Sequence, residues 1–411
     1  MTLDQHLRDE APTKRDPAVR DLPLAPPGKM GPPPEYDALQ RECPMASVRL
    51  PVGDGQGWFL SRYDDVRSVL ADPRLVRPTV QNWPPPPAPS PRPGPDLVTM
   101  MELEGPRHTA LRRALADVFS VKAVRAHQHR IREQADRLLD AVAAGGQPGE
   151  LVRGFTEPFP LLVMCDLVGI PYDEREHFVP LADAPFNALL GLDDARRATA
   201  PVHEYATELI ERKRREPAED ILTDLVRRRD AGELTDEDVI TFGLSMLLTG
   251  HRTSAVFLTN AVLLLLTEPE QFVGVRATGE VSSSAVEELL RYLPVMNAEV
   301  ILQVTEDVEL CGRTVAAGET VLPSIAAANR DETVFPDAGR LDLTRVRNPH
   351  LAFGRGAHNC VGAHLGRAQL KVGLEALLAR FPSLHLTVDE DELAWDDEAT
   401  PKAPLALPVG W

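Results

Sequence analysis

The sequence has few cysteines and no long unbroken apolar run, and both absences exclude classes of protein. Its 411 residues include four unevenly spaced cysteines, so we expect no disulfide framework and a reducing, cytoplasmic location. The longest apolar stretch, residues 254–267, is too short to cross a bilayer and contains Asn260. Residues 1–20 are mostly polar and charged, so neither a secretory signal nor a membrane anchor is expected.

Basic residues are also in short supply. The chain has 44 Lys and Arg against 62 Asp and Glu, which gives a formal net charge of −18. A nucleic-acid-binding domain usually carries a basic surface, so a nucleic-acid partner is not expected. With 43% hydrophobic residues the chain can bury a large core, and its length allows two or three domains or one large enzyme.

The hydrophobic pattern predicts a mainly α protein with small β-sheets. Thr235, followed three positions later by Asp238, is typical of a helix start, and we expect one long apolar helix over residues 239–266. Apolar runs separated by glycines predict two hairpin regions. Further helices are expected over residues 64–72, within 106–266 and over 280–292, and the hairpins over 48–63 and 304–323.

Residues 353–362 carry the strongest functional signal. An aromatic residue, three glycines and a histidine surround Cys360 in what we predict to be a tight loop. A helical repeat of apolar residues follows, so the sulfur lies just before a helix N-terminus, where the backbone N–H groups and the dipole favour a thiolate. A thiolate held in this way can be the axial ligand of a haem iron.

Two other interpretations of this cysteine are less favoured. Free cysteines are usually small buried hydrophobes, which is how we interpret Cys43, Cys165 and Cys311. A zinc site built from Cys360 with His358 and His364 is disfavoured, because no CxxC or second ligand pair occurs elsewhere.

Residues 353–362 resemble the haem-binding loop of the cytochromes P-450, with every motif position filled. Further signatures occur in the family's order, so the resemblance extends over residues 48–411. It implies the cytochrome P-450 fold, which is a triangular, helix-rich single domain. We therefore expect an extended lead-in over residues 1–35 and one haem-binding catalytic domain over 36–411. The implied cofactor is haem b, with Cys360 as the iron ligand.

Glu288 and Arg291 match the family's ExxR signature. Taken alone, such a pair three positions apart is usually a solvated surface pair. The resemblance implies a buried structural network that locks the cysteine loop, with Arg340 as the third charged partner. A carboxylate between two guanidinium groups can be buried when it is paired and hydrogen-bonded.

His108 and Arg112 lie four positions apart and share one face of a predicted helix. The resemblance assigns both to the haem propionates, together with His358. Leu302 or Gln303 stands where the family often has another propionate-binding arginine. We therefore expect the remaining basic groups to contribute more to propionate binding. The expected cofactor-binding set is Cys360, His108, Arg112, His358, Phe353, Arg355 and Gly354.

Polar residues interrupt the long apolar helix at Gly250, His251, Arg252 and Thr253, and such local inconsistency is expected at functional sites. In the resembling family the matching threonine helps to deliver protons to iron-bound dioxygen, after an acid at the preceding position. Arg252 stands where that acid is expected, so the usual acid-linked relay is in doubt. We take the four residues as candidate catalytic residues. Arg252 either belongs to a changed relay or faces outward and pairs with a distant acid.

Residues 83–95 are rich in proline, which excludes a helix and favours polyproline II. The resemblance makes this segment the substrate-recognition loop over the haem, and a linker between domains is the alternative. The segments expected to line the substrate pocket are residues 80–100, 180–192, 243–253, 294–302 and 395–400.

The predicted function is a haem-thiolate oxidoreductase that activates dioxygen to oxidise a small natural-product intermediate. The reaction is either hydroxylation or oxidative C–C or C–N coupling of an aromatic substrate, and the resemblance of residues 351–411 to the cyclodipeptide-coupling branch suggests a cyclodipeptide. A haem sensor or carrier without oxygen chemistry is the alternative. We expect a monomer that receives electrons from a ferredoxin or flavodoxin-type donor. A basic patch would steer this donor, and it comprises Arg112, Arg113, Arg355, Arg367 and Lys371.

Overall fold

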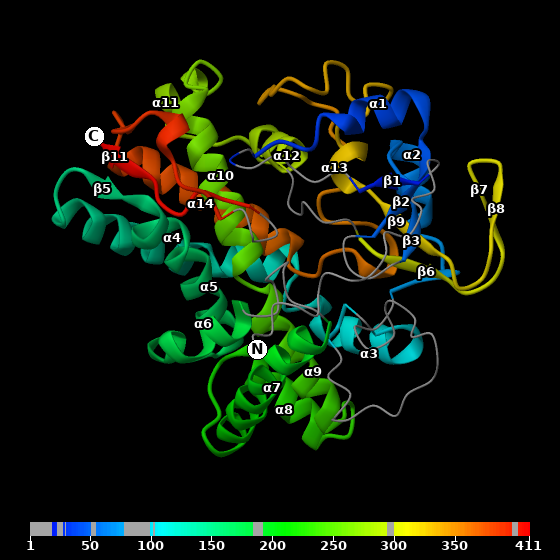
Figure 1. Cartoon of the computed structure of the whole chain (residues 1–411). Coiled ribbons are helices and arrows are strands. Elements are labelled where there is room, and N and C mark those ends of the chain that lie inside the picture. The colour runs from blue at the N-terminus through cyan, green and yellow to red at the C-terminus, as the bar shows by residue number, and fades with distance from the viewer. Residues whose placement is uncertain are drawn as a thin grey trace, which may run out of the picture.

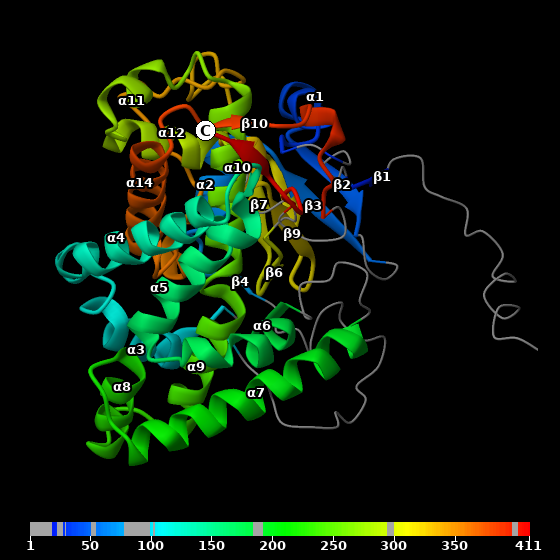
Figure 2. The same cartoon turned by 90° about the vertical axis from the view of Figure 1, so that its left-hand side faces the viewer.

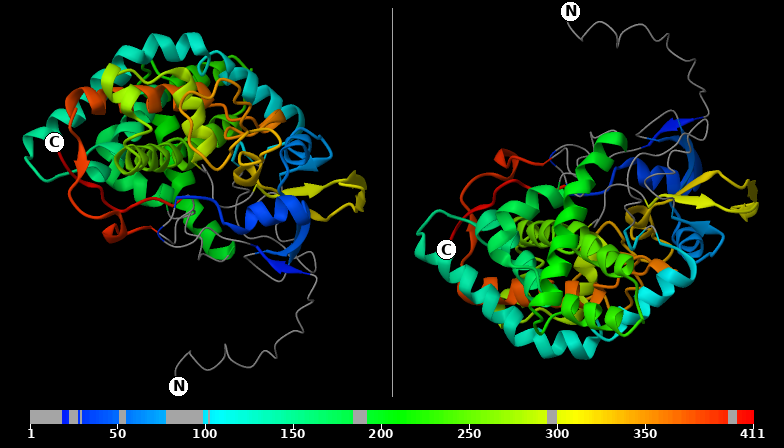
Figure 3. Two further views of the ribbon diagram at one scale, coloured as in Figure 1. Left: turned by 90° about the horizontal axis from the view of Figure 1, so that it is seen from above. Right: turned by 90° about the horizontal axis from the view of Figure 1, so that it is seen from below.

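The computed structural model describes residues 19–22, 28, 30–50, 55–77, 99–101, 103–183, 192–293, 300–396 and 402–411. Helices form most of this part of the chain. The large sheet and the hairpin of β7 (Val308–Leu310) and β8 (Arg313–Val315) lie on one side of the helical body, and β5 (Gly149–Glu150) and β11 (Pro408–Gly410) lie on the other (Figure 1). Seen from above and below, the blue and yellow strands lie at one edge (Figure 3). The prediction of a mainly α protein with small sheets is confirmed.

The helices vary from one turn to 24 residues in length. Those before residue 235 are α1 (Glu35–Glu42), α2 (Tyr63–Val69), α3 (Gly105–Ala116), α4 (Val121–Ala144), α5 (Pro158–Val168), α6 (Arg175–Asp183), α7 (Leu192–Arg215) and α8 (Ile221–Asp230). The later ones are α9 (Asp236–Thr249), α10 (Arg252–Thr267), α11 (Val273–Thr278), α12 (Ser283–Tyr292), α13 (Ile325–Ala328) and α14 (Ala363–Arg380). In two perpendicular views α7 and α8 lie at the opposite end of the molecule from α11 and α12 (Figures 1 and 2).

The strands form three sheets. The largest has the order β1-β2-β3-β9-β6-β4, the second β10-β11-β5, and the third is the β7–β8 hairpin. Their bounds are β1 Arg20–Asp21, β2 Met45–Arg49, β3 Gln56–Leu60, β4 Leu75–Val76, β5 Gly149–Glu150, β6 Leu302–Val304, β7 Val308–Leu310, β8 Arg313–Val315, β9 Thr320–Pro323, β10 His385–Leu386 and β11 Pro408–Gly410. Strand β9 joins the early β2–β3 hairpin to β6, because it pairs in parallel with β3 and antiparallel with β6.

Helix α10 occupies the interior of the helical body and packs against α5 and α14. Gly373 of α14 makes this approach possible, because a Cβ atom there would lie 3.2 Å from Phe159 and 3.4 Å from Leu258. The largest cluster of buried apolar residues includes these helices and most of the other helices, and two smaller clusters lie against the large sheet. Helix α14, which follows the cysteine loop, is thereby packed against the interior helix.

The prediction of one helix over residues 239–266 is wrong, because the chain forms α9 and α10 with a break at Gly250 and His251. His251 has φ −125° and ψ −46°, outside helical geometry. A Cβ atom at Gly250 would lie 2.5 Å from the Met246 carbonyl oxygen, so a larger residue would not fit this turn. The helix start at Thr235 is confirmed as a capping box with Asp238.

The interpretation of the other cysteines needs one correction. Cys165 is buried and Cys43 is half-buried, but Cys311 is exposed. Cys311 lies in the turn between β7 and β8 and has a positive φ of 51°, so the turn holds it outside the core.

Candidate active site

The loop before α14 is a tight turn that presents Cys360. Gly354 and Gly356 have φ values of +70° and +75°, which side chains with a Cβ atom rarely adopt. A Cβ atom at Gly356 would also lie 2.5 Å from the Leu70 carbonyl oxygen, so the loop packs directly on the backbone after α2. The Cys360 N–H donates to the Phe353 carbonyl at 2.8 Å and closes the loop.

The thiol of Cys360 faces a cavity of about 560 Å³ that Arg112, Phe353 and Arg367 also line. The Cys360 residue is exposed at this cavity. The protein around the sulfur still limits its solvation, and this burial raises the pKa of the thiol. The backbone N–H of Gly362 and the guanidinium groups of Arg112 and Arg367 act against burial and lower the pKa. The same groups would stabilise a thiolate at this position.

Three of the predicted propionate-binding residues meet beside this loop. His108 of α3 is buried and stacks on His358, with 4.4 Å between the ring centroids. Burial, His358 and Arg112 lower the pKa of His108 to about 4, so this imidazole is neutral at pH 7. Arg112 donates to the Asn359 carbonyl at 2.5 Å, and His358 Nε2 lies 2.9 Å from a carboxylate oxygen of Glu104.

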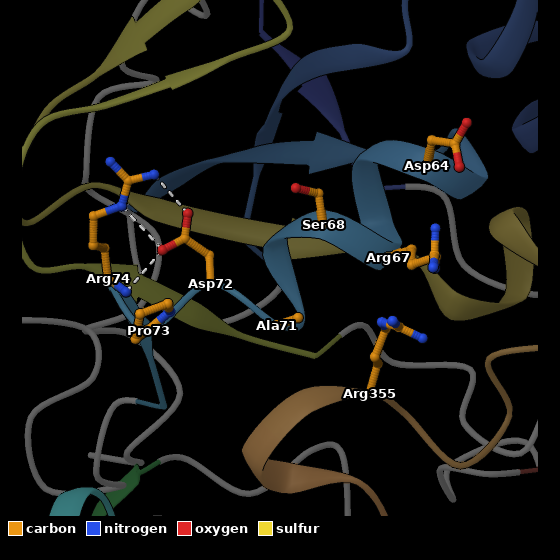
Figure 4. Close-up of a pocket in the computed structure, with 8 residues that line it drawn as sticks. All are labelled: Asp64, Arg67, Ser68, Ala71, Asp72, Pro73, Arg74 and Arg355. Atoms are coloured by element: carbon orange, nitrogen blue, oxygen red, sulfur yellow. Dashed lines mark hydrogen bonds and ion pairs between the residues drawn. The ribbon is translucent and has the colours of Figure 1, made fainter.

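Arg355 lies apart from that group. Its side chain is exposed and lines a different cavity, next to Arg67 of α2 and away from the Asp72–Arg74 pair (Figure 4). Leu302 is buried in β6, and Gln303 donates to the Gly318 carbonyl at 3.5 Å. Neither of these two residues supplies a cation to the site.

Glu288 and Arg291 form a fully buried, bidentate ion pair in α12, with both N–O distances 2.8 Å. The expectation that Arg340 completes the network is wrong. The Arg340 side chain is exposed, and only its backbone carbonyl accepts a bond from Arg291 at 3.2 Å. Arg345 is the second guanidinium, because its Nε donates to Glu288 at 3.0 Å.

The remaining contacts of this network reach toward the cysteine loop. Arg291 also donates to the carbonyls of Asn329 and Ala338, at 2.8 Å each. The side-chain oxygen of Asn329 in turn accepts from the Leu351 N–H at 2.8 Å, just before the loop. Helix α12 and the start of the cysteine loop are thereby joined through buried polar contacts.

A second network beside the loop was not predicted from the sequence. Glu287 binds Arg367 through both carboxylate oxygens, at 2.6 and 2.9 Å, and lies 2.9 Å from His350 Nε2. The Ala352 N–H donates to Nδ1 of His350, so Nε2 carries the proton and donates to Glu287. The guanidinium of Arg367 lies 4.5 Å from the ring centroid of Phe353. Glu287 directly precedes the ExxR glutamate, and that adjacency was the available signal.

We expect Glu287→Gln to lower the free energy of unfolding at pH 7 by about 1–3 kcal/mol. Burial would raise the pKa of Glu287, but its bonds to His350 and Arg367 outweigh burial and lower the pKa to about 2. A carboxyl with a depressed folded-state pKa stabilises the protein above its unfolded pKa, and this stabilisation is lost as the pH falls through the folded value. The measurement is urea unfolding of both proteins from pH 8 to pH 3.

The difference between the proteins is expected to stay constant from pH 8 to pH 5 and to shrink below about pH 4. Glu219→Gln, at an exposed glutamate before α8, is the control and should have almost no effect. A difference that stays unchanged down to pH 3 would contradict the lowered pKa of Glu287.

The break between α9 and α10 holds the four candidate catalytic residues. Residues 249, 250 and 252–254 are half-exposed, whereas most of the surrounding helical residues are buried. Thr253 donates to the Thr249 carbonyl at 3.3 Å, and His251 is buried. Arg252 forms an ion pair with the distant Asp396 at 3.1 Å, as the second expected arrangement has it, but its side chain is only 21% exposed and does not face outward.

Four stretches of the predicted lining segments lie outside the described residues: 80–98, which includes the proline-rich segment 83–95, 184–191, 294–299 and 397–400. Within the described ranges no cluster of three His, Cys, Asp or Glu residues could hold a metal ion, so no zinc site forms there. No described helix is long and apolar enough to cross a membrane.

Comparisons with known proteins identify the family. The cytochrome P450 family model matches residues 280–407. The nocardicin C N-oxygenase of Nocardia uniformis subsp. tsuyamanensis is 37% identical over 395 residues, which cover 96% of this chain and 99% of the relative. The crystal structure of HinD with NMFT and NO is 38% identical with a TM-score of 0.88, covering 97% of this chain and 100% of that one. The chain belongs to the cytochrome P450 family.

This membership confirms the fold and the class of reaction expected from the sequence. Related proteins include the mycinamicin IV hydroxylase/epoxidase of Micromonospora griseorubida, 36% identical over 92% of this chain and 94% of the relative. The chain is a cytochrome P450 monooxygenase, an oxidoreductase that works with haem iron, a small-molecule substrate and a redox partner. The alternative of a haem sensor or carrier is therefore disfavoured.

Proposed function

We propose that this monooxygenase oxidises a natural-product intermediate and uses haem b with Cys360 as the axial ligand. The observation that carries the proposal is the accessible thiol of Cys360, held at the start of α14 beside a cavity and among cationic groups. The nocardicin and mycinamicin enzymes act on natural products, which supports the substrate class. The four free cysteines support a reducing, cytoplasmic location.

The residues around Cys360 fit a haem. The donor set offers one sulfur for the iron, as haem-thiolate proteins require, and Arg112, His108 and His358 beside it for the two carboxylates. The bound haem supplies the activation of dioxygen. The chain's own groups would hold the sulfur in place, offer the Arg112 guanidinium and the imidazoles of His108 and His358 to the carboxylates, and place Thr253 beside the break between α9 and α10.

The relatives support two types of reaction. The hydroxylase/epoxidase adds oxygen to its substrate, and a P450 structure with biaryl coupling reactivity is 33% identical with a TM-score of 0.86. That structure covers 96% of this chain and 100% of its own. We propose hydroxylation or oxidative coupling of an aromatic substrate, with aromatic cyclodipeptides as the first compounds to test. In either reaction the chain selects the outcome through the position of the substrate.

A binding and turnover screen tests the function. Aromatic cyclodipeptides, terpenes and macrolides are added to the haem-loaded protein, and shifts of the haem absorption band identify ligands. Binders are then incubated with a reductase, a ferredoxin and a nicotinamide cofactor. A product with one more oxygen atom indicates hydroxylation, and a product that has lost two hydrogen atoms indicates coupling. Haem binding without substrate-dependent consumption of reducing equivalents would instead support a carrier.

We propose a ferredoxin or flavodoxin-type protein as the electron donor, docking over a cavity of about 830 Å³ beside the cysteine loop. Arg67, Arg347 and Arg355 line this cavity, and none has an ion-pair partner among the described residues. Two members of the patch expected from the sequence are already paired, Arg367 with Glu287 and Lys371 with Glu375. The free positive charge therefore lies nearer to α2 than the sequence predicts.

We expect Arg67→Glu and Arg347→Glu each to raise the ferredoxin concentration for half-maximal turnover by roughly three- to tenfold at low salt. The effect should shrink as salt screens the charges. Arg228→Glu, on α8 at the far end of the helical body, is the control. Equal effects from all three variants would indicate a response to net charge, and altered substrate-induced spectral shifts would indicate damage to the pocket.

A further inference from the structure

Two C-terminal segments pair with each other beside α10, and we call them the C-terminal arms (residues 394–396 and 402–405). Trp395 forms a β-bridge with Pro404. The Asp396 N–H donates to the Ala403 carbonyl at 3.0 Å, and the Leu405 N–H donates to the Ala394 carbonyl at 2.8 Å. The two arms therefore form one hydrogen-bonded unit.

Side chains of α10 attach both arms to the interior of the molecule. Arg252 Nη2 lies 3.1 Å from the Asp396 carboxylate on the first arm. Asn260 is buried, and its Nδ2 donates to the Lys402 carbonyl on the second arm at 2.9 Å. The two attachment points are eight positions apart, which is about 12 Å along an α-helix. The arms thus follow α10 for about two turns, starting at the break beside Thr253.

The chemistry of Arg252 suits a fixed ion pair better than proton transfer. A guanidinium keeps its charge at all ordinary pH values, so it cannot release and recover a proton as a carboxylic acid does. Its planar group is pre-organised for a carboxylate, and little side-chain freedom is lost in binding one. Asp396 supplies that carboxylate from 144 positions away in the sequence.

We propose that Arg252 is a positioning residue: through Asp396 it holds the C-terminal arms against α10 beside Thr253, where the arms form one wall of the substrate site. This wall determines how the substrate lies, so the ion pair influences which position of the substrate is oxidised. The part of the inference that concerns the substrate rests on the proposed function. The attachment of the arms does not, and it can be tested separately.

Hydrogen exchange tests the attachment in the haem-loaded protein without any substrate. The amides of Asp396 and Leu405 report the pairing of the arms. We expect Arg252→Gln and Asp396→Asn each to speed their exchange by roughly three- to tenfold, and the double variant to exchange no faster than either single variant. The reversed pair, Arg252→Glu with Asp396→Arg, should recover part of the protection. Unchanged exchange in both single variants would overturn the proposal.

Turnover measurements separate positioning from proton delivery. If the ion pair positions the substrate, Arg252→Gln and Asp396→Asn change the ratio of products and the substrate affinity in the same direction. If Arg252 delivers protons, Arg252→Gln lowers the product formed per reducing equivalent while Asp396→Asn does not, and the proposal is overturned. The control is Arg380→Gln, which removes an exposed ion pair with Asp140 between α14 and α4.

The hydrogen-exchange experiment and the turnover experiment test different claims, and either claim can fail without the other. If the wild-type protein oxidises no compound in the screen, the proposed function fails while hydrogen exchange still decides whether Arg252 holds the arms. If the wild-type protein turns over but the four variants match it in exchange, affinity and product ratio, the inference about Arg252 fails and the proposed function stands.

Discussion

Cys360→Ala is expected to abolish the thiolate-type spectrum of the reduced, carbon-monoxide-bound protein and with it all oxygenation of substrate. In the proposed function this sulfur would be the iron ligand, and a thiolate-type spectrum requires a thiolate. Among the described residues that line its cavity, no other side chain has a sulfur atom, and His350 and His364 offer only nitrogen. The measurement is the reduced carbon monoxide difference spectrum, with haem content determined separately.

Cys360→Ser and Cys311→Ala make the result interpretable. Serine keeps nearly the same volume, so Cys360→Ser should fold normally and still lose the thiolate-type spectrum. Cys311 lies exposed in the β7–β8 turn, so Cys311→Ala should keep both spectrum and activity. A thiolate-type spectrum in Cys360→Ser would show that another group binds the iron.

Local rules explain why the cysteine loop could be predicted from the sequence. Gly354 and Gly356 adopt positive φ, and the apolar repeat after Gly362 forms α14, which begins at Ala363. Turn chemistry and helical periodicity depend on neighbours within a few positions, and the sequence displays those neighbours directly. The capping box at Thr235 is confirmed for the same reason.

The errors arose where side-chain direction or distant contacts decide the outcome. Arg340 and Arg345 lie in one irregular segment. The course of its backbone brings the Arg345 side chain to Glu288 and leaves the Arg340 side chain exposed to solvent. At the Gly250 break the chain also packs closely on the distant Met164, which a Cβ atom would approach to 3.1 Å. Periodicity within one helix contains no information on such contacts, so the continuous helix was the natural prediction.

The same limit applies to Arg252 within the candidate site. The sequence showed that a base replaces the expected acid and left two arrangements open. The ion pair with Asp396 spans 144 positions, and counting along the chain does not single out one acid among many. The positive charge of Arg252 therefore indicated that the site departs from the family pattern. The fold was needed to show that this arginine pairs with Asp396.

Glu288→Ala is expected to cost about 3–5 kcal/mol of folding free energy, enough to leave much of the protein unfolded or without haem. The carboxylate balances two guanidinium groups, and it also accepts bonds from the Asp342 N–H and the Asn348 side chain at 2.9 and 3.0 Å. Its removal leaves the fully buried Arg291 without its charge partner. Urea unfolding and haem content after purification measure the loss.

Alanine at Arg340 and at Arg345 provides the matched comparison within the same segment. Arg345→Ala should be clearly destabilising, because its guanidinium reaches Glu288 and it also donates to the Pro336 carbonyl at 2.9 Å. Arg340→Ala should change stability by less than about 0.5 kcal/mol, since an exposed side chain is removed and the backbone carbonyl that binds Arg291 remains. A larger loss for Arg340→Ala than for Arg345→Ala would contradict the network and return Arg340 to the role that the sequence suggested.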